Sequence, residues 1–161
     1  MSVEFRGAFA PGDIGALTRL HGELYAREYG YGVAFEGYCA QGIAEVALAF
    51  DTNRDRVWLC DVDGTLAGSL MLAHRDRGCA QLRFFLLAPV LRGQGLGKRL
   101  MAEYMAALAT LGYSRSYLWT TNDLPVAASL YTRHGFQLTE SVPSTRFGKA
   151  LVEQRYDLSV G

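Results

Sequence analysis

An excess of charge of one sign is absent from this 161-residue sequence, in which sixteen basic side chains balance sixteen acidic ones. Nucleic-acid-binding domains usually carry a basic excess or a basic stripe, and disordered chains usually carry a large net charge. The zero net charge argues against both classes. Lysine is scarce: fourteen of the basic residues are arginine. Arginine suits the recognition of carboxylate and phosphate groups, although base bias in a genome explains such an excess equally well.

Cysteine is also scarce. Cys39, Cys60 and Cys79 are odd in number, far apart in sequence and without a C-x-x-C pair. That spacing excludes both a disulfide framework and a zinc-ligand motif. We therefore expect no bound metal and a protein that resides in a reducing compartment.

Long apolar runs are missing as well. The longest uncharged apolar run covers residues 84–91, far short of the roughly 20 residues that cross a bilayer. The first ten residues include Glu4 and Arg6 and lack the apolar stretch of a signal peptide. We expect a soluble, cytoplasmic protein that binds neither a membrane nor nucleic acid.

No internal repeat, low-complexity segment or linker rich in Pro, Gly or Ser divides the chain. Half of its residues are apolar, and a chain of this length buries roughly two thirds of its unfolded surface as one domain. Residues 1–161 are therefore expected to form a single domain.

The periodicity of apolar residues predicts an α/β domain in the order β-α-α-β-β-β-α-β-α-β-β. Asp13 is expected to cap the first helix, and Asp63-Gly64 is a two-residue hairpin signal. Three antiparallel strands in a row predict a mixed, mostly antiparallel sheet flanked by helices. The expected helices follow Asp13, cover residues 36–50, run from after Pro89 to Gly112, and cover 125–134; the expected strands cover residues 3–9, 57–62, 65–74, 79–88, 116–121, 136–142 and 152–158.

The most informative segment is a glycine-rich loop between a strand and a helix, Arg92-Gly93-Gln94-Gly95-Leu96-Gly97-Lys98. Backbone N–H groups at the start of a helix are unpaired and attract anions, and glycines let a phosphate approach them. Arg92 and Lys98 add positive charge, unless they simply form a solvated helix start. The loop predicts a pyrophosphate site.

Two other phosphate-binding loops are excluded by spacing. A Walker A loop requires G-x-x-x-x-G-K-[ST], whereas Arg92 occupies the first glycine position and Arg99 the last position. A dinucleotide-binding loop requires G-x-G-x-x-G at the start of a parallel βαβ unit, whereas Lys98 replaces the last glycine and the strand follows two hairpins.

The loop resembles the Q/R-x-x-G-x-G/A motif of the GNAT family of N-acetyltransferases, which bind acetyl-coenzyme A. Residues 130–136, Leu-Tyr-Thr-Arg-His-Gly-Phe, are similar to the second landmark of that family, L-Y-x-x-x-G-F. The predicted element order agrees over nearly the whole chain. Residues 147–154 also resemble the acetyltransferase domains that are fused to winged-helix regulators in bacteria.

The resemblance implies an N-acetyltransferase in which the amine of a small-molecule or peptide acceptor attacks the acetyl-CoA thioester directly, in a ternary complex. Tyr131 would protonate the departing thiolate, unless it is only a core tyrosine. A homodimer is also implied. The cofactor would be held by the main chain of Phe85 and Leu87 and by Arg92, Gly93, Gln94, Gly95, Leu96, Gly97 and Lys98.

Two positions depart from the family pattern. Leu124 occupies the place of a frequent family Asn, so we expect Asn122 to contact the cofactor, with helix capping by Asn122 and Asp123 as the alternative. Trp119 occupies the place of a frequent basic Glu and cannot accept a proton. The remaining candidates for a general base are Glu36, His74 and His21, and a water chain would need none of them.

An aromatic cluster near the first two helices comprises Tyr25, Tyr29, Tyr31, Phe35 and Tyr38. Core packing is its first interpretation, and an acceptor pocket or a dimer surface is the second.

The two departures from the family pattern, Trp119 and Leu124, leave a rival function open. This rival is a non-catalytic module that binds acetyl-CoA as a signal.

Overall fold

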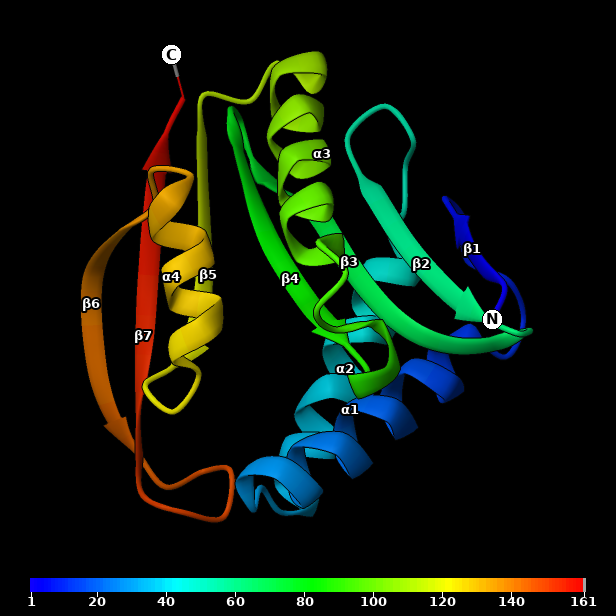
Figure 1. Cartoon of the computed structure of the whole chain (residues 1–161). Helices are drawn as coiled ribbons and strands as arrows, with labels where there is room; N and C mark the ends of the chain where they lie inside the picture. The colour runs from blue at the N-terminus through cyan, green and yellow to red at the C-terminus, as the bar shows by residue number, and fades with distance from the viewer. Residues whose placement is uncertain (161) are drawn as a thin grey trace.

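The computed structural model describes residues 1–160, and its elements follow the predicted order (Figure 1). The α/β prediction is confirmed, although the first strand ends at Arg6 rather than Phe9 and the second helix begins at Val33 rather than Glu36. The helices are α1 (Asp13–Tyr29), α2 (Val33–Leu48), α3 (Leu96–Leu111) and α4 (Pro125–Arg133), with a short 3-10 helix η1 (Pro89–Leu91) before α3. The strands are β1 (Val3–Arg6), β2 (Arg56–Val62), β3 (Thr65–Asp76), β4 (Cys79–Leu87), β5 (Arg115–Thr121), β6 (Gln137–Ser144) and β7 (Leu151–Ser159).

One seven-stranded sheet has the order β1-β2-β3-β4-β5-β7-β6. Neighbouring strands are antiparallel except β4 and β5, whose parallel ladder covers only the pairs from Cys79–Arg115 to Gln81–Tyr117. Beyond Gln81 the two strands diverge, so the sheet opens between them (Figure 1). This opening positions the site described below.

The hydrophobic core has two parts because helices cover both faces of the sheet. Tyr104 and Leu108 of α3 belong to the cluster under α3 and α4, and Leu17 and Ile43 belong to the cluster under α1 and α2. Central strand β3 lies between the two parts, and its residues 67–73 are all buried. A strand that is covered on both faces does not need to alternate apolar and polar residues.

Asp13 does not cap α1 as predicted. Gly12 is the N-cap residue, with a left-handed φ of 96°, and no side chain caps this helix within residues 1–160. The buried Asp13 carboxylate instead accepts hydrogen bonds from Arg6 Nη1 and Nη2 (2.8 and 2.9 Å) and from the N–H of Ala10 (2.7 Å). Arg6 also donates from Nε to Asp61 (2.6 Å), so this ion-pair network joins β1, α1 and β2.

Replacing Arg6 with Met should lower the free energy of unfolding by about 3 kcal/mol at neutral pH, because two largely buried carboxylates lose their partner. The hydrogen bonds of Arg6 hold the pKa of Asp13 below its usual range. The ion pair therefore stabilises the fold above about pH 4, and its contribution is lost as the pH falls through the lowered pKa. Urea unfolding at neutral and strongly acidic pH measures this, and an equal loss at both pH values would contradict it. Arg19→Met, which breaks an exposed pair with Glu23, is the matched control and should change little.

The three cysteines are buried and free, in α2, β2 and β4. In the same described part of the chain, no helix combines the length and apolar character needed to span a bilayer. Nor do three or more His, Cys, Asp or Glu side chains of residues 1–160 gather in a way that could hold a metal ion.

Candidate active site

A bulge in β4 interrupts the alternation of the strand and places two consecutive side chains, Arg83 and Phe84, on the same face of the sheet. Phe84 and Phe85 together stand opposite a single residue of β3, and Phe84 adopts a left-handed φ of 50°. Bulges of this kind re-aim side chains and are common beside active sites. Here Arg83 and Phe84 both reach Gly42 on α2, whereas Phe85 packs in the cluster beneath α3 and α4.

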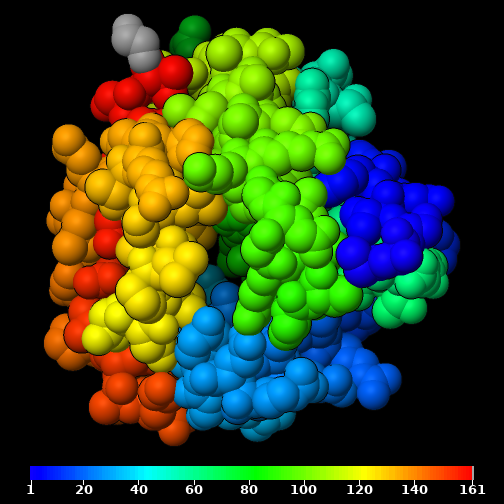
Figure 2. Space-filling view, viewed as in Figure 1, coloured from blue at the N-terminus to red at the C-terminus, as the bar shows by residue number. Residues whose placement is uncertain are grey.

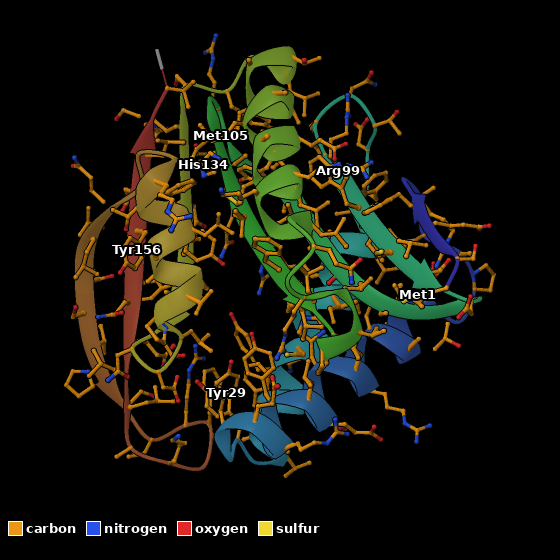
Figure 3. All side chains as sticks on the ribbon, viewed as in Figure 1. Met1, Tyr29, Arg99, Met105, His134 and Tyr156 are labelled. Carbon is orange, nitrogen blue, oxygen red and sulfur yellow. The ribbon has the colours of Figure 1, made fainter. Side chains whose placement is uncertain are left out.

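A cavity of about 440 Å³ lies where β4 diverges from β5, on the side of α3 and α4. Figure 2 shows this hollow between α4 and the segment that leads into α3. Figure 3 places Tyr29, the last residue of α1, beside the opening, and Tyr29 also lines the cavity. Of the residues predicted to bind the cofactor or to act in catalysis, the walls include Phe85, Leu87, Arg92, Gly93, Gly97 and Tyr131.

The glycine loop has the backbone that its sequence requires. Gly93 and Gly95 adopt φ values of 74° and 77°, and no atom of the described chain lies within 4 Å of a Cβ built on either residue. Gly95 is the N-cap of α3, and no side chain of the described residues caps that helix. The N–H groups of the first turn of α3 therefore remain available to an anion that enters the open space over the loop.

Arg92, which the sequence predicts to add positive charge to the loop, is paired with an acidic side chain. Its Nη1 and Nη2 atoms donate to the two carboxylate oxygens of Glu28 on α1, each at 2.7 Å, and its Nε donates to the carbonyl of Leu87 at 3.0 Å. These bonds hold the pKa of Glu28 below its usual range. Gln94 donates to the carbonyl of Val90 at 2.8 Å, while Lys98 is exposed in the first turn of α3. Arg92 and Gln94 thus fix the loop, and Lys98 supplies its charge.

A second, smaller cavity of about 110 Å³ faces α1 and α2 on the other side of the sheet. The two cavities have part of their walls in common, because five residues line both. This shared wall consists of Tyr25, Phe85, Leu124, Ala127 and Tyr131. Two molecules bound in the two cavities would therefore meet at the shared wall.

Tyr131 lies on α4 and is only 5% exposed. Its ring packs near the rings of Phe85 (6.4 Å between centroids), Phe136 (6.2 Å) and Tyr156 (6.4 Å). Burial raises the pKa of its phenol well above the ordinary value of 10. The Tyr131 hydroxyl therefore remains protonated at physiological pH.

The profile of the Acetyltransferase (GNAT) family matches residues 22–136, which is well over half of the chain and includes the glycine loop and Tyr131. This protein belongs to the GNAT acetyltransferase family. The family predicted from the sequence is thus confirmed.

Individual relatives agree with this assignment. The acetyltransferase is 28% identical to the Escherichia coli K12 N-acetyltransferase YjgM, itself uncharacterized, over 127 residues that cover 76% of this chain and 75% of YjgM. It shares its fold with a GNAT acetyltransferase from Desulfovibrio desulfuricans (TM-score 0.74, 19% identity, 99% and 100% of the two chains covered). It also shares its fold with the Salmonella typhimurium protein yncA, described as an acetyltransferase and solved with its cofactor acetyl-CoA (TM-score 0.69, 15% identity, 100% and 95% covered).

Asn122 lies outside both cavity walls of this GNAT acetyltransferase. Its N–H donates to the carbonyl of Val152 (3.0 Å), and its Oδ1 accepts from the N–H of Val152 (2.8 Å), which ties the end of β5 to β7. The alternative of helix capping is wrong, because Leu124 is the N-cap of α4 and no side chain of residues 1–160 caps this helix. Asp123 instead accepts hydrogen bonds from Tyr31 Oη (2.7 Å) and Lys149 Nζ (3.2 Å).

Of the three candidate bases, His21 alone belongs to the described walls of these two cavities. Glu36 packs against Gly22 of α1, and the His74 ring contacts the Tyr113 hydroxyl (2.9 Å), remote from both cavities. His21 is 2% exposed in the wall of the smaller cavity, and burial lowers its pKa to about 4. Its imidazole is therefore neutral in the folded protein.

The aromatic cluster proves to be both core and cavity wall. Tyr31 and Phe35 are buried, their rings lie 4.9 Å apart, and both line the smaller cavity beside Tyr25 and Tyr38. Tyr29 lines the larger cavity instead.

Several residues of the smaller cavity were missed by sequence reasoning, and the charged and aromatic ones among them include Arg83, Arg146, Phe147 and Glu153. Arg83 sits in the strand that carries Phe85 and Leu87, and a charged residue within an apolar buried strand is the one sign that could have marked it. The other three lie in and after a loop whose path the sequence does not reveal.

Proposed function

We propose that this GNAT acetyltransferase moves the acetyl group of acetyl-CoA to the primary amine of a small-molecule or peptide acceptor by direct attack in a ternary complex. The observation that carries the proposal is the shared wall, which joins one cavity beside the glycine loop to another cavity lined by α1 and α2. A cofactor and an acceptor that enter from opposite sides would meet there without any covalent carrier.

The larger cavity fits acetyl-CoA because open space stands over Gly93 and Gly95 where side chains would otherwise project. When bound, acetyl-CoA supplies an activated acetyl thioester. The N–H groups of the first turn of α3, together with Lys98, hold the pyrophosphate, and the main chain of Phe85 and Leu87 lines the pantetheine arm. Arg92 keeps the loop in position through Glu28.

Tyr131 acts as the general acid. The amine nitrogen bonds to the acetyl carbon as the bond from that carbon to sulfur breaks; the phenol of Tyr131 protonates the sulfur, and the nitrogen releases one proton to water, which restores the phenol. A cysteine carrier is disfavoured although Cys39 lines the smaller cavity, because burial raises the pKa of its thiol to about 12.

Initial rates with acetyl-CoA varied at several fixed amine concentrations test the proposal. Direct attack gives intersecting double-reciprocal lines, whereas a covalent acetyl-enzyme gives parallel lines and would overturn it. The rival function, a non-catalytic module, requires acetyl-CoA binding in calorimetry with no acetylated product from any member of a broad amine panel.

A further inference from the structure

Two polar side chains in the wall of the smaller cavity have hydrogen-bonding capacity that residues 1–160 do not use. They are the imidazole of His21 on α1 and the guanidinium of Arg83 on β4. Both are at least nine-tenths buried, so water does not readily satisfy them. A ligand in this cavity is therefore expected to carry the groups that they lack.

The Nε2 atom of His21 has no donor among residues 1–160 that could hydrogen-bond to it. Its Nδ1 lies 2.8 Å from the carbonyl of Leu17, and since a carbonyl only accepts, Nδ1 must carry the hydrogen. Nε2 is then a bare acceptor, and it is buried without a partner among the described residues. An unsatisfied buried acceptor is unfavourable, and the N–H of an amine would satisfy it.

Arg83 lacks an oxyanion. Its side chain is 10% exposed, yet the carboxylate of Glu45 lies 4.0 Å away and is engaged by Arg75 at 2.8 Å. The Tyr38 hydroxyl accepts one weak hydrogen bond at 3.4 Å. A buried guanidinium normally has a close anionic partner, and its planar fork fits a carboxylate or a phosphonate.

The charge of the cavity wall points to the same ligand. The only carboxylate in that wall is Glu153, which accepts from Arg146 Nε at 2.8 Å, and His21 is neutral. Arg83 is therefore the charged side chain that no carboxylate of the described cavity wall pairs, and it is positive. The cavity favours a ligand with a negative group.

We propose that the acceptor is a small amine that also carries an oxyanion, an inference that rests on the proposed function. Arg83 binds the oxyanion, and Nε2 of His21 accepts a hydrogen bond from the amine N–H. Both side chains flank the Phe84 ring, whose centroid lies 5.6 Å from that of His21 and 4.7 Å from Cζ of Arg83. Both also line the same cavity, so one small molecule bound there can contact both groups. The positive φ of Phe84 in the β4 bulge places its ring beside both side chains.

Matched pairs of acceptors test the proposal: phenylalanine against phenethylamine, methionine against 3-methylthiopropylamine, and β-alanine against propylamine. We expect kcat/KM at least 100-fold higher for the acid member of the pair that fits best, a discrimination typical of sites built around a buried polar group. Aminophosphonates of the same length identify which oxyanion is preferred. Equal kcat/KM for both members of every pair would overturn the proposal.

Arg83→Gln should abolish this preference by raising KM for the acid member about 100-fold more than KM for the plain amine. Arg115→Gln is the matched control, because Arg115 is an exposed arginine paired with Asp76 and outside the cavity. An Arg83 that only supports the fold would instead slow both members of a pair equally, and this result would overturn the assignment.

His21→Phe keeps an aromatic ring but removes the acceptor atom. It should lower kcat/KM for every acceptor at least tenfold, with unchanged acetyl-CoA affinity and an unchanged or higher melting temperature. His21→Gln, which retains an acceptor atom, should recover part of the loss. Full activity of His21→Phe would overturn the role of Nε2.

Binding measurements separate failure of this proposal from failure of the proposed function. N-acetylated aminocarboxylates should raise the melting temperature more than the matched N-acetylated amines, and Arg83→Gln should remove the difference. Acetylation of plain amines and of amines that carry an oxyanion at equal rates would overturn only the proposal on acceptor class. Acetyl-CoA binding with no turnover of any amine would sink the proposed function and this proposal with it.

Discussion

Replacing Tyr131 with Phe should lower kcat by roughly 100-fold while acetyl-CoA affinity stays nearly constant, because only the acidic proton is removed. The ring and its contacts with Phe85, Phe136 and Tyr156 remain. Since burial raises the pKa of Tyr131, the wild-type rate should also show no fall caused by this phenol as the pH approaches 10. Steady-state kinetics and calorimetry on one preparation measure both effects.

Tyr156→Phe is the matched control for this experiment. Tyr156 is a buried tyrosine that lies with Tyr131 in the hydrophobic cluster under α3 and α4, but it lines neither cavity. A tyrosine that serves only packing would lose about 1 kcal/mol of stability with its hydroxyl and would keep its rate. If Tyr131→Phe retains full turnover and merely melts lower, Tyr131 is not the general acid.

Gly95→Val should weaken acetyl-CoA binding at least tenfold, a loss of about 1.4 kcal/mol in binding free energy. Gly95 adopts a φ of 77°, which a β-branched residue adopts only with strain, and a side chain there would occupy the open space over the loop. Calorimetric titration with acetyl-CoA provides the measurement.

Gly37→Ala separates loop geometry from a general intolerance of added methyl groups. Gly37 lies within α2 with open space around it and no left-handed φ, so alanine should stabilise the protein by roughly 0.5–1 kcal/mol and leave the affinity unchanged. A folded Gly95→Val protein with wild-type affinity would mean that the pyrophosphate binds elsewhere.

Local patterns were sufficient to predict the fold. The Asp63-Gly64 hairpin forms with both residues at positive φ, and Gly112 ends α3 in the left-handed conformation that such a stop requires. The cap of α1 was one local error. Asp13 has the right residue type for capping, but Arg6, seven residues away, holds its carboxylate.

The site was predictable only where one continuous segment builds it. The conformation of the glycine loop depends on Gly93 and Gly95 themselves, so the sequence of this segment was sufficient to predict the loop. The ion pair of Arg92 with Glu28 joins residues 64 positions apart in the sequence. The placement of Arg83 beside Phe84 depends on a bulge in β4 that the composition of the strand does not reveal. Asn122, which the sequence predicts to contact the cofactor, accepts a hydrogen bond from the backbone of Val152 on β7, a partner that local sequence does not reveal.

The bulge of β4 also has a consequence for how this enzyme can change over time. Arg83 and Phe84 line only the smaller cavity and Leu87 lines only the larger one, while Phe85 lines both, so a single strand contributes largely different side chains to the two cavities. A substitution at residue 83 or 84 alters the smaller cavity, which we propose to bind the acceptor, and leaves the residues around the glycine loop in place. Acceptor preference can therefore diversify one residue at a time, without a new acetyl donor site having to arise alongside it.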